Sequence, residues 1–484
     1  MNRILRMVCA AAVGMVLFSA CAEQETVSYT ENEKIALRAW MELHHPELVA
    51  NYQSDGAYYV DVLERGSLDA KPINDTATWV RFTFTGRNLG GDIVLSRSEI
   101  ESRQVGTYTK YTHYVPYFKF YAGDRNTSLL EGTYLAMRNK LTLGKEYAAQ
   151  HNLPAEIEMR YGTKVTLYMP STVVGVDGMG GTGGYEGQAG YELKSGYPFV
   201  VTMEITDTVR NPLQREGVDV DAFARQNGGV LPVVPKPSNP KQMQANGLMQ
   251  WTPANDTIPH IYIKHSFKPT EKFIYSSAYK SIYAPYADFA KLEQDICDTL
   301  VNRFGVYDPS QVTEDKVTLK GAAKIWYIAR LLDGFIIDSN IPGVRQLVFG
   351  EKTSQGKPME YTPESGGAIE AFYYAIPHLR YGQWAGLVTS SANAYGSQGK
   401  PGKTTTSGSS SNNYDYLNYY NSMNSYYGAN NYYGGYGGYY GGYMGGQYEN
   451  YNVPTTPKVT TTTTSTEIQP YAPLLFELYI EKKK

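Results

Sequence analysis

One segment of this chain cannot contribute to a folded core. Between Gly402 and Ile468 the sequence consists almost entirely of Tyr, Gly, Asn, Ser and Thr, with few charges and almost no aliphatic side chains. Such a composition buries too little apolar surface to offset the conformational entropy that is lost on ordering. The Tyr/Gly-rich insertion 403–467 is therefore expected to be disordered or loosely ordered, and the sequence on either side of it must build the fold.

The two flanks of this insertion carry the pattern of one small β-domain. Before it, an apolar strand pattern starts at Ile325 and reaches a tight turn at Asp333-Gly334, and a second apolar segment ends at Asp338. After it, the segment from Ile468 to Ile480 ends in an apolar Leu-Leu-Phe-Glu-Leu run and completes the pattern. A short helix is expected in between, because four apolar residues fall on one helical face: Ile369, Phe372, Ile376 and Leu379.

These motifs resemble the FKBP family of peptidyl-prolyl isomerases. The resemblance rests on Asp333-Gly334 followed by Asp338-Ser339, on Ala394-Tyr395-Gly396 and on the final strand, and it covers Gly321 to the C-terminus apart from the insertion. It implies a pocket in which Tyr395 donates a hydrogen bond to the substrate carbonyl and Asp338 polarises the amide, with Tyr327 beside them as the third catalytic residue. It also implies a substrate-binding wall made of Ile337, Ala368, Ile369, Phe372, Ile468 and Phe476.

The chemistry of prolyl isomerisation fits this inventory. Rotation about an X-Pro bond must overcome a barrier of about 18–20 kcal/mol, because the twisted amide loses its resonance. An apolar pocket and a hydrogen bond to the neighbouring carbonyl can lower it, so neither a cofactor nor a metal is expected. The chain departs from the family at Ile337 and Phe372, where the family usually has an aromatic residue and a tryptophan. An active enzyme and a domain that merely binds therefore both remain open.

The first half of the chain repeats the second weakly. Residues 84–94 align with 327–337, and Met169–Gly175 aligns with Ser390–Gly396. Leu95 then takes the place of the aspartate and Val174 that of the tyrosine, which predicts a non-catalytic copy. The predicted fold class is α+β, with two FKBP-like domains, each an antiparallel sheet wrapped around a short helix. The degenerate domain is expected at 51–210 and the second at 257–484, and a Pro/Gly/Asn-rich linker at 211–256 joins them.

The N-terminus reads as a bacterial lipoprotein signal. Residues 1–20 combine a basic start with a short apolar run, and Cys21 follows Ser19-Ala20 as the expected lipidation site. Residues 21–50 are expected to form a tether and a helix. This predicts an outer-membrane, lipid-anchored protein on the periplasmic or cell-surface face. Net charge is -3 without a basic stripe, so nucleic acid is not an expected partner.

These expectations favour an envelope lipoprotein that acts as a peptidyl-prolyl cis-trans isomerase or chaperone. Its partners would be proline-containing unfolded or exported polypeptides, outer-membrane proteins among them. The alternative is a non-catalytic FKBP-like adaptor or structural subunit of an outer-membrane assembly or secretion complex. Asp338 and Tyr395 favour catalysis, whereas the reduced pocket walls favour the adaptor. The tyrosine content alone suggests a third hypothesis, a glycan-binding surface lipoprotein.

Overall fold

The computed structural model describes most of the chain. The described residues are 29–73, 78–96, 98–106, 108, 112–120, 131–173, 198–228, 231–232, 260–265, 267–269, 271–276, 289–313, 315–317, 322–350, 356–362, 368–400, 403–407 and 460–481. The chain divides into two compact units, one of Met1–Ser96 with Lys119–Thr208 and one of Arg97–Phe118 with Val209–Lys484. Both combine helices with an antiparallel sheet, as an α+β chain should.

The first unit is built on a seven-stranded sheet. Its strand order is β1 (Tyr52–Gln53), β2 (Tyr58–Arg65), β8 (Thr163–Met169), β9 (Phe199–Val209), β3 (Trp79–Asn88) and β4 (Ile93–Ser96), with β5 (Tyr117–Phe120) beside β3. The remaining elements are α2 (Tyr29–His44), η1 (Pro46–Asn51), α4 (Glu131–Arg138), the β6 (Leu141–Thr142) and β7 (Glu156–Ile157) pair, α5 (Lys145–Gln150) and η3 (Ser171–Val173). Buried and partly buried residues alternate along most of β3 and β9, as the period of a strand requires.

The second unit is built on a sheet of the same size. Its strand order is β10 (Leu231–Pro232), β11 (Ile261–His265), β15 (Trp384–Thr389), β18 (Leu474–Ile480), β12 (Ala323–Leu331) and β13 (Ile336–Ser339), with β14 (Met359–Tyr361) beside β12. Its helices are α3 (Glu99–Gln104), α6 (Pro212–Gln226), α9 (Phe289–Phe304), α10 (Pro342–Phe349) and α11 (Glu370–Ala375), with the short turns η5 (Pro309–Gln311), η6 (Ile376–His378) and η7 (Ser391–Asn393).

The two units share one strand topology. In chain order, the five central strands of the first sheet are β2, β3, β4, β8 and β9, and those of the second are β11, β12, β13, β15 and β18. The pairs in the first sheet are β2–β8, β8–β9, β9–β3 and β3–β4. Those in the second sheet are β11–β15, β15–β18, β18–β12 and β12–β13, which join strands of the same rank in chain order. Each set follows a helix, α2 in one unit and α6 in the other. A duplication accounts for all of these correspondences.

The hairpin register confirms the first of the two predicted repeat alignments. In β3–β4, Gly86 faces Leu95 and Arg87 faces Ile93, with a bulge between Gly86 and Arg87. In β12–β13, Ala329 faces Asp338 and Arg330 faces Ile336, with a bulge at the same place. Leu95 therefore holds the backbone position of Asp338, although its side chain lies outside the described residues.

The second alignment was wrong by one residue. The Ser171 amide and hydroxyl both donate to Glu33 of α2, and those of Ser391 donate to Glu216 of α6. Ser171 thus corresponds to Ser391 rather than to Ala392, so the predicted match of Val174 with Tyr395 does not hold. The sequence match slipped because Pro170 and Ser390, which precede the two serines, are unlike residues. Residues 174–197 lie outside the described part of the chain.

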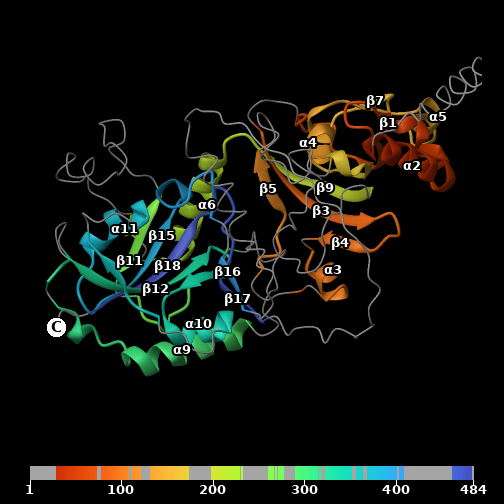
Figure 1. Cartoon of the computed structure of the whole chain (residues 1–484). Coiled ribbons are helices and arrows are strands. Elements are labelled where there is room, and N and C mark those ends of the chain that lie inside the picture. The colour runs from red at the N-terminus through yellow and green to blue at the C-terminus, as the bar shows by residue number, and fades with distance from the viewer. Residues whose placement is uncertain are drawn as a thin grey trace, which may run out of the picture. The chain divides into compact units, whose positions relative to one another are not determined.

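Helices cover both faces of the second sheet. On one face α11 packs against a core that includes Ile325, Leu387 and Leu478. On the other face α9 and α10 pack against Trp326, Ile328 and Trp384. Figure 1 shows α9 and α10 running along the lower side of this sheet and α11 on the upper side. Cys297 lies buried on α9 with a free thiol.

Part of the predicted linker is a helix of the second unit. Within 211–256, residues 212–226 form α6 and Leu231–Pro232 forms β10, which pairs with β11. Val220 and Phe223 of α6 pack against Phe267 and Phe273. The Pro- and Asn-rich flanks obscured this helix, whose N-terminal proline suits a first turn. Residues 233–259 lie outside the described residues.

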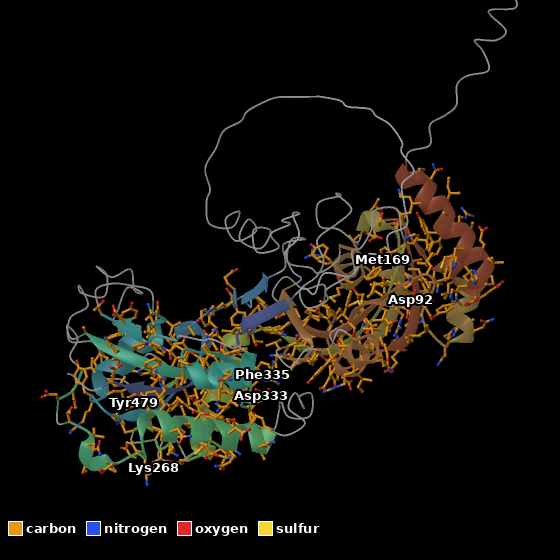
Figure 2. The ribbon with its side chains drawn as sticks, turned by 60° about the horizontal axis from the view of Figure 1, so that its bottom comes forward. Asp92, Met169, Lys268, Asp333, Phe335 and Tyr479 are labelled. Carbon is orange, nitrogen blue, oxygen red and sulfur yellow. The ribbon has the colours of Figure 1, made fainter. Side chains whose placement is uncertain are left out.

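A segment from the first half of the chain belongs to the second unit. The His113 ring lies 2.7 Å from a carboxylate oxygen of Asp333, and both side chains are buried. Asp333 also accepts from the Phe335 amide at 3.0 Å. Figure 2 shows Asp333 and Phe335 next to each other. The predicted turn at Asp333-Gly334 is thus confirmed, with Gly334 at a φ of 94°. His113 and Pro116, expected in the first domain, thus contact Asp333 and Gln469 of the second unit.

The predicted signal and anchor stay predictions. Residues 1–28, including Cys21, lie outside the described residues. Within the described part of the chain, no helix is both long enough and apolar enough to cross a bilayer. Of the predicted insertion 403–467, both ends are ordered rather than loose, because β16 (Lys403–Ser407) and β17 (Thr460–Ser465) pair as an antiparallel ribbon. The residues 408–459 between them lie outside the described part.

Candidate functional site

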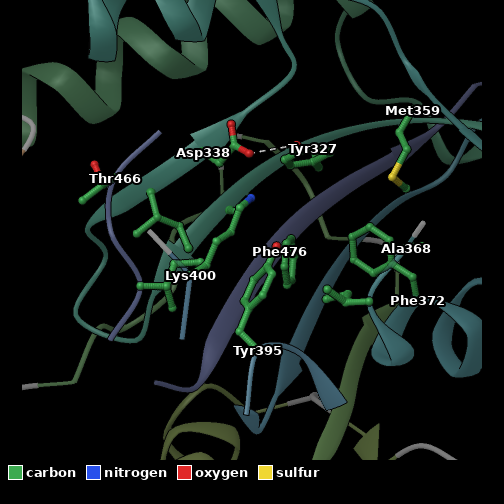
Figure 3. Close-up of a pocket in the computed structure, with 13 residues that line it drawn as sticks. Tyr327, Asp338, Met359, Ala368, Phe372, Tyr395, Lys400, Thr466 and Phe476 are labelled. Carbon is green, nitrogen blue, oxygen red and sulfur yellow. Dashed lines mark hydrogen bonds between the residues drawn. The ribbon is translucent and has the colours of Figure 1, made fainter. Parts of the chain in front are cut away.

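A cavity of about 170 Å³ opens on the α11 face of the second sheet. Its walls come from strands β12, β13, β14 and β18, from the start of α11 and from the segments on either side of the β16–β17 ribbon (Figure 3). The lining residues are Tyr327, Ala329, Ile337, Asp338, Met359, Ala368, Ile369, Phe372, Tyr395, Lys400, Thr466, Ile468 and Phe476.

All nine residues predicted for the pocket line this one cavity. They are the three proposed catalytic residues and the six proposed substrate contacts, although they lie as far as 149 positions apart between Tyr327 and Phe476. The structure thus brings together what the sequence placed in separate motifs. The chemical role of each residue stays a prediction.

A hydrogen-bonded pair forms the polar side of the pocket. Tyr327 of β12 donates its hydroxyl to Asp338 of β13 at 3.1 Å, across the two strands of one hairpin (Figure 3). Arg345 of α10 approaches the other carboxylate oxygen at 3.4 Å and also donates to the Ser339 carbonyl. Asp338 therefore has a fixed orientation, with one oxygen toward the pocket tyrosine and one toward the guanidinium.

Burial dominates the electrostatics of this pair. Removal from water raises the pKa of the Asp338 carboxyl above its ordinary value, while Lys400, Arg345 and the Tyr327 hydroxyl oppose that rise. Burial and the nearby Asp338 charge raise the pKa of Tyr327 well above its ordinary value. Tyr327 thus stays a neutral hydroxyl across the physiological range, able to donate a hydrogen bond.

Aromatic rings form the apolar side. The rings of Phe372 and Phe476 meet edge to face with centroids 4.9 Å apart, and Tyr327 meets Phe476 at 6.3 Å in the same manner. Such contacts hold rings in place without polar groups. Ile337, Ile369 and Ile468 complete the wall, so a ligand ring entering here would lose its contact with water.

The loop that carries Tyr395 is tied to α6. The carboxylate of Glu216 accepts from the Ser391 amide and, at 2.6 Å, from its hydroxyl, while Ser391 in turn accepts from the amides of Ala394 and Gly396 at 2.8 Å. Tyr395 lies between those two residues. Burial raises the pKa of Glu216, although the hydrogen bonds from Ser391 oppose that rise. A helix that the sequence did not reveal thus positions a predicted catalytic residue.

Four lining residues were missed by sequence reasoning. Ala329 follows from the alternation of β12, since it lies two residues after Tyr327 on the same face. Thr466 and Lys400 flank the β16–β17 ribbon, and the low-complexity composition nearby gave no signal for them. Met359 belongs to β14, a three-residue strand without a clear pattern.

The β3–β4 hairpin of the first unit lacks the polar and open features that the β12–β13 hairpin gives to the pocket. Phe84 takes the position of Tyr327 and is buried, so the ring remains without its hydroxyl. Gly86 takes the position of Ala329, and the Phe199 ring lies so close that a Cβ on Gly86 would be only 2.1 Å from it. This ring fills the space beside the hairpin. Among the described residues, no group of three or more His, Cys, Asp or Glu side chains could hold a metal ion in either unit.

Comparison with known proteins gives structural likenesses only. No family model matches the chain, and no curated protein sequence matches it. The three FKBP domains of wheat FKBP73 share 10% identity, with 89% of this chain and 95% of that chain covered at a TM-score of 0.21. A peptidyl-prolyl cis-trans isomerase of Pseudomonas syringae pv. tomato shares 13%, with 57% and 96% covered and a TM-score of 0.23.

FkpA from Escherichia coli shares 15% identity, with 43% of this chain and 74% of that chain covered and a TM-score of 0.23. Overlays with such TM-scores do not by themselves establish a shared function, so the chemistry of the pocket has to support any proposal. The solved structures named above, to which this chain is similar, are FKBP-type peptidyl-prolyl isomerases.

Proposed function

We propose that the second unit is an FKBP-like peptidyl-prolyl cis-trans isomerase domain. The observation that carries the proposal is the pocket itself, in which an aromatic and aliphatic wall faces the Tyr327–Asp338 pair. Its volume of about 170 Å³ is smaller than the roughly 300–1,000 Å³ of pockets for drug-sized ligands, a size suited to one small ring. The first unit, with Leu95 and Phe84 at the matching positions, serves as a non-catalytic FKBP-like domain.

The proposed chemistry needs no covalent step. The proline ring packs into the cavity against the contacting rings of Phe372 and Phe476, where water is excluded. Tyr395 donates a hydrogen bond to the substrate carbonyl. Asp338, held by Tyr327, presents its negative charge to the amide as it twists and loses conjugation. Stabilising the twisted amide more than the planar one is what lowers the barrier.

The test is isomerase activity of the full-length protein in a refolding reaction limited by prolyl isomerisation. We expect acceleration by the unmodified protein. Tyr395→Phe should lower kcat/KM by about tenfold, because loss of one hydrogen bond of about 1.4 kcal/mol has that effect. Phe84→Tyr in the first unit is the matched control and should leave the rate unchanged. A folded protein without any acceleration would refute the proposal.

The finer function concerns where the enzyme acts. We infer that it is an outer-membrane lipoprotein, acylated at Cys21, that serves as an isomerase or chaperone for exported polypeptides and outer-membrane proteins. The sequence of residues 1–25 supports this. Membrane fractionation of a Cys21→Ala variant tests it, because loss of the anchor should release the protein from the membrane. Full membrane retention of the variant would contradict the lipid assignment.

A second candidate is a non-catalytic adaptor or structural subunit of an envelope complex. The Lys400 side chain, which lines the pocket, favours it, as do Ile337 and Phe372 where the family usually has larger rings. In that case the pocket would bind a proline-containing segment of a partner without accelerating its isomerisation. Binding of proline peptides without rate enhancement would support the adaptor, and enhancement would support the enzyme.

A further inference from the structure

Lys400 is a pocket residue that contacts neither the proline ring nor the substrate carbonyl in the proposed isomerisation, although its charge opposes the raised pKa of Asp338. Its amide donates to the Ile468 carbonyl at 2.8 Å, and its own carbonyl accepts from the Ile468 amide at 2.7 Å. The side chain therefore leaves from a fixed point of the pocket rim, three residues before the β16–β17 ribbon begins. Such anchoring makes the direction of the side chain a property of the fold.

The amine reaches toward the polar side of the pocket. Nζ lies 5.3 Å from the centroid of the Tyr395 ring. Figure 3 shows the side chain extending across the cavity, with its nitrogen directed toward Asp338. A long cationic side chain thus occupies space that a substrate must enter, above the ring of a predicted catalytic residue.

The charges around the pocket do not cancel. Asp338 already has Arg345 at 3.4 Å. Among the described residues, the structure gives Lys400 no carboxylate within the 4.0 Å of an ion pair. Of the described residues that line the cavity, Asp338 supplies a carboxylate that Arg345 already approaches, and Lys400 supplies an ammonium group with no carboxylate within ion-pair distance. A partner that brings its own carboxylate would complete the arrangement.

We propose that Lys400 makes this pocket selective for prolines that have an acidic residue directly beside them. This rests on the proposed isomerase function. A Glu or Asp side chain next to the proline would pair with the ammonium group and draw it out of the cavity as the ring enters. A neutral peptide must displace the amine without that gain, and a basic one would be repelled. Charge complementarity of this kind sets specificity more than total affinity.

The test compares peptides that differ only in charge. Acetyl-Ala-Xaa-Pro-Yaa-Ala-amide is prepared with Glu or Gln at Xaa or at Yaa, and exchange between the cis and trans forms is measured by NMR with the full-length protein. The neutral ends keep other carboxylates out of the assay. We expect kcat/KM for the Glu peptides to exceed that for the Gln peptides by about threefold to fivefold, the range of a partly exposed ion pair.

Two variants locate the effect. Lys400→Gln should abolish the preference, while Lys291→Gln should keep it, because Lys291 is an exposed residue of α9 on the opposite face of the sheet. Salt at 1 M should weaken the preference, since it screens charges over about 3 Å. Equal rates for Glu and Gln peptides in the unmodified protein would overturn this proposal and leave the isomerase function standing.

The same experiment distinguishes failure of the proposed isomerase function from failure of the proposed charge preference. If no peptide is isomerised faster by the folded protein, the proposed function falls. The same peptides are then titrated against the protein by NMR. Tighter binding of the Glu peptides, lost in Lys400→Gln, would support the charge preference for a binding pocket. Equal binding of the Glu and Gln peptides would overturn it there too.

Discussion

At the residue scale, one charged side chain, that of Arg330, is almost fully buried in the core of the second unit. Arg330 is 1% exposed and donates to Glu477 of β18 and Glu293 of α9, each at 2.7 Å. Burial raises the pKa of Glu477, although the guanidinium beside it opposes that rise. This network ties α9 to the sheet, and every member depends on the others.

Arg330→Met should destabilise the second unit by about 3–5 kcal/mol, because it leaves two buried carboxylates without their cation. Adding Glu293→Gln and Glu477→Gln to that variant should restore most of the loss, since no uncompensated charge remains. Chemical denaturation of the three proteins measures both effects. A triple variant no more stable than Arg330→Met alone would show that the lost packing, rather than charge, dominates.

Titration of Asp338 should change the stability of the protein and its catalytic rate in opposite directions. Because the folded-state pKa is raised above 3.8, the stability contribution of Asp338 is present at low pH and lost as pH rises through the folded pKa. The proposed catalysis needs the ionised form, so the rate should fall as pH drops through that same value. Asp338→Asn should be slower at neutral pH and should lack this acidic decline. A decline unchanged in Asp338→Asn would assign it to another group.

At the element scale, the tie between α6 and the Tyr395 loop makes a prediction about both stability and rate. Glu216→Ala leaves the buried Ser391 amide and hydroxyl without their acceptor, at a cost of about 2–4 kcal/mol. It should also lower the isomerase rate through Tyr395, whereas Glu216→Gln, which can still accept and donate, should retain most of both.

The matched control lies in the first unit. Glu33→Ala removes the same two hydrogen bonds from Ser171 and should cost similar stability there without changing the rate. Adding Tyr395→Phe to Glu216→Ala should lower the rate little further, because both act through one side chain. Additive losses would contradict a positioning role for Glu216.

The limits of the sequence prediction are also clearest at this scale. The β12–β13 hairpin and the short α11 helix carry their signals locally, in alternation, a turn and one apolar face, so sequence reasoning placed them and the pocket residues on them. Helix α6 did not stand out in the sequence, because it begins with a proline and one residue of its buried face is the charged Glu216. Lys400 lies beside a low-complexity tract, and His113 finds Asp333 from 220 residues away.

At the scale of the whole molecule, the boundary of the second unit is a prediction about folding. The fragment 257–484, which the sequence suggested as a domain, lacks α6 and the segment that holds His113. Burial of Val220 and Phe223 alone is worth about 3–6 kcal/mol, comparable with the stability of a small domain.

We therefore expect this fragment to show no cooperative unfolding transition. A fragment from residue 209 onward should show a partial one, because it regains α6 but not the His113–Asp333 contact. Circular dichroism during urea titration measures both. Full, cooperative stability of 257–484 would contradict the assignment of α6 and residues 97–118 to this unit.

The proposed function depends on one property of the second-unit pocket, which is that it lowers the barrier to prolyl isomerisation. The most direct measurement is the cis–trans exchange rate of a proline peptide with the full-length protein, beside Tyr395→Phe and Asp338→Asn. We predict acceleration by the unmodified protein and a reduction of about tenfold in each variant that remains folded. Acceleration that neither variant reduces would place the activity outside this pocket, and no acceleration at all would show that the protein is not a prolyl isomerase.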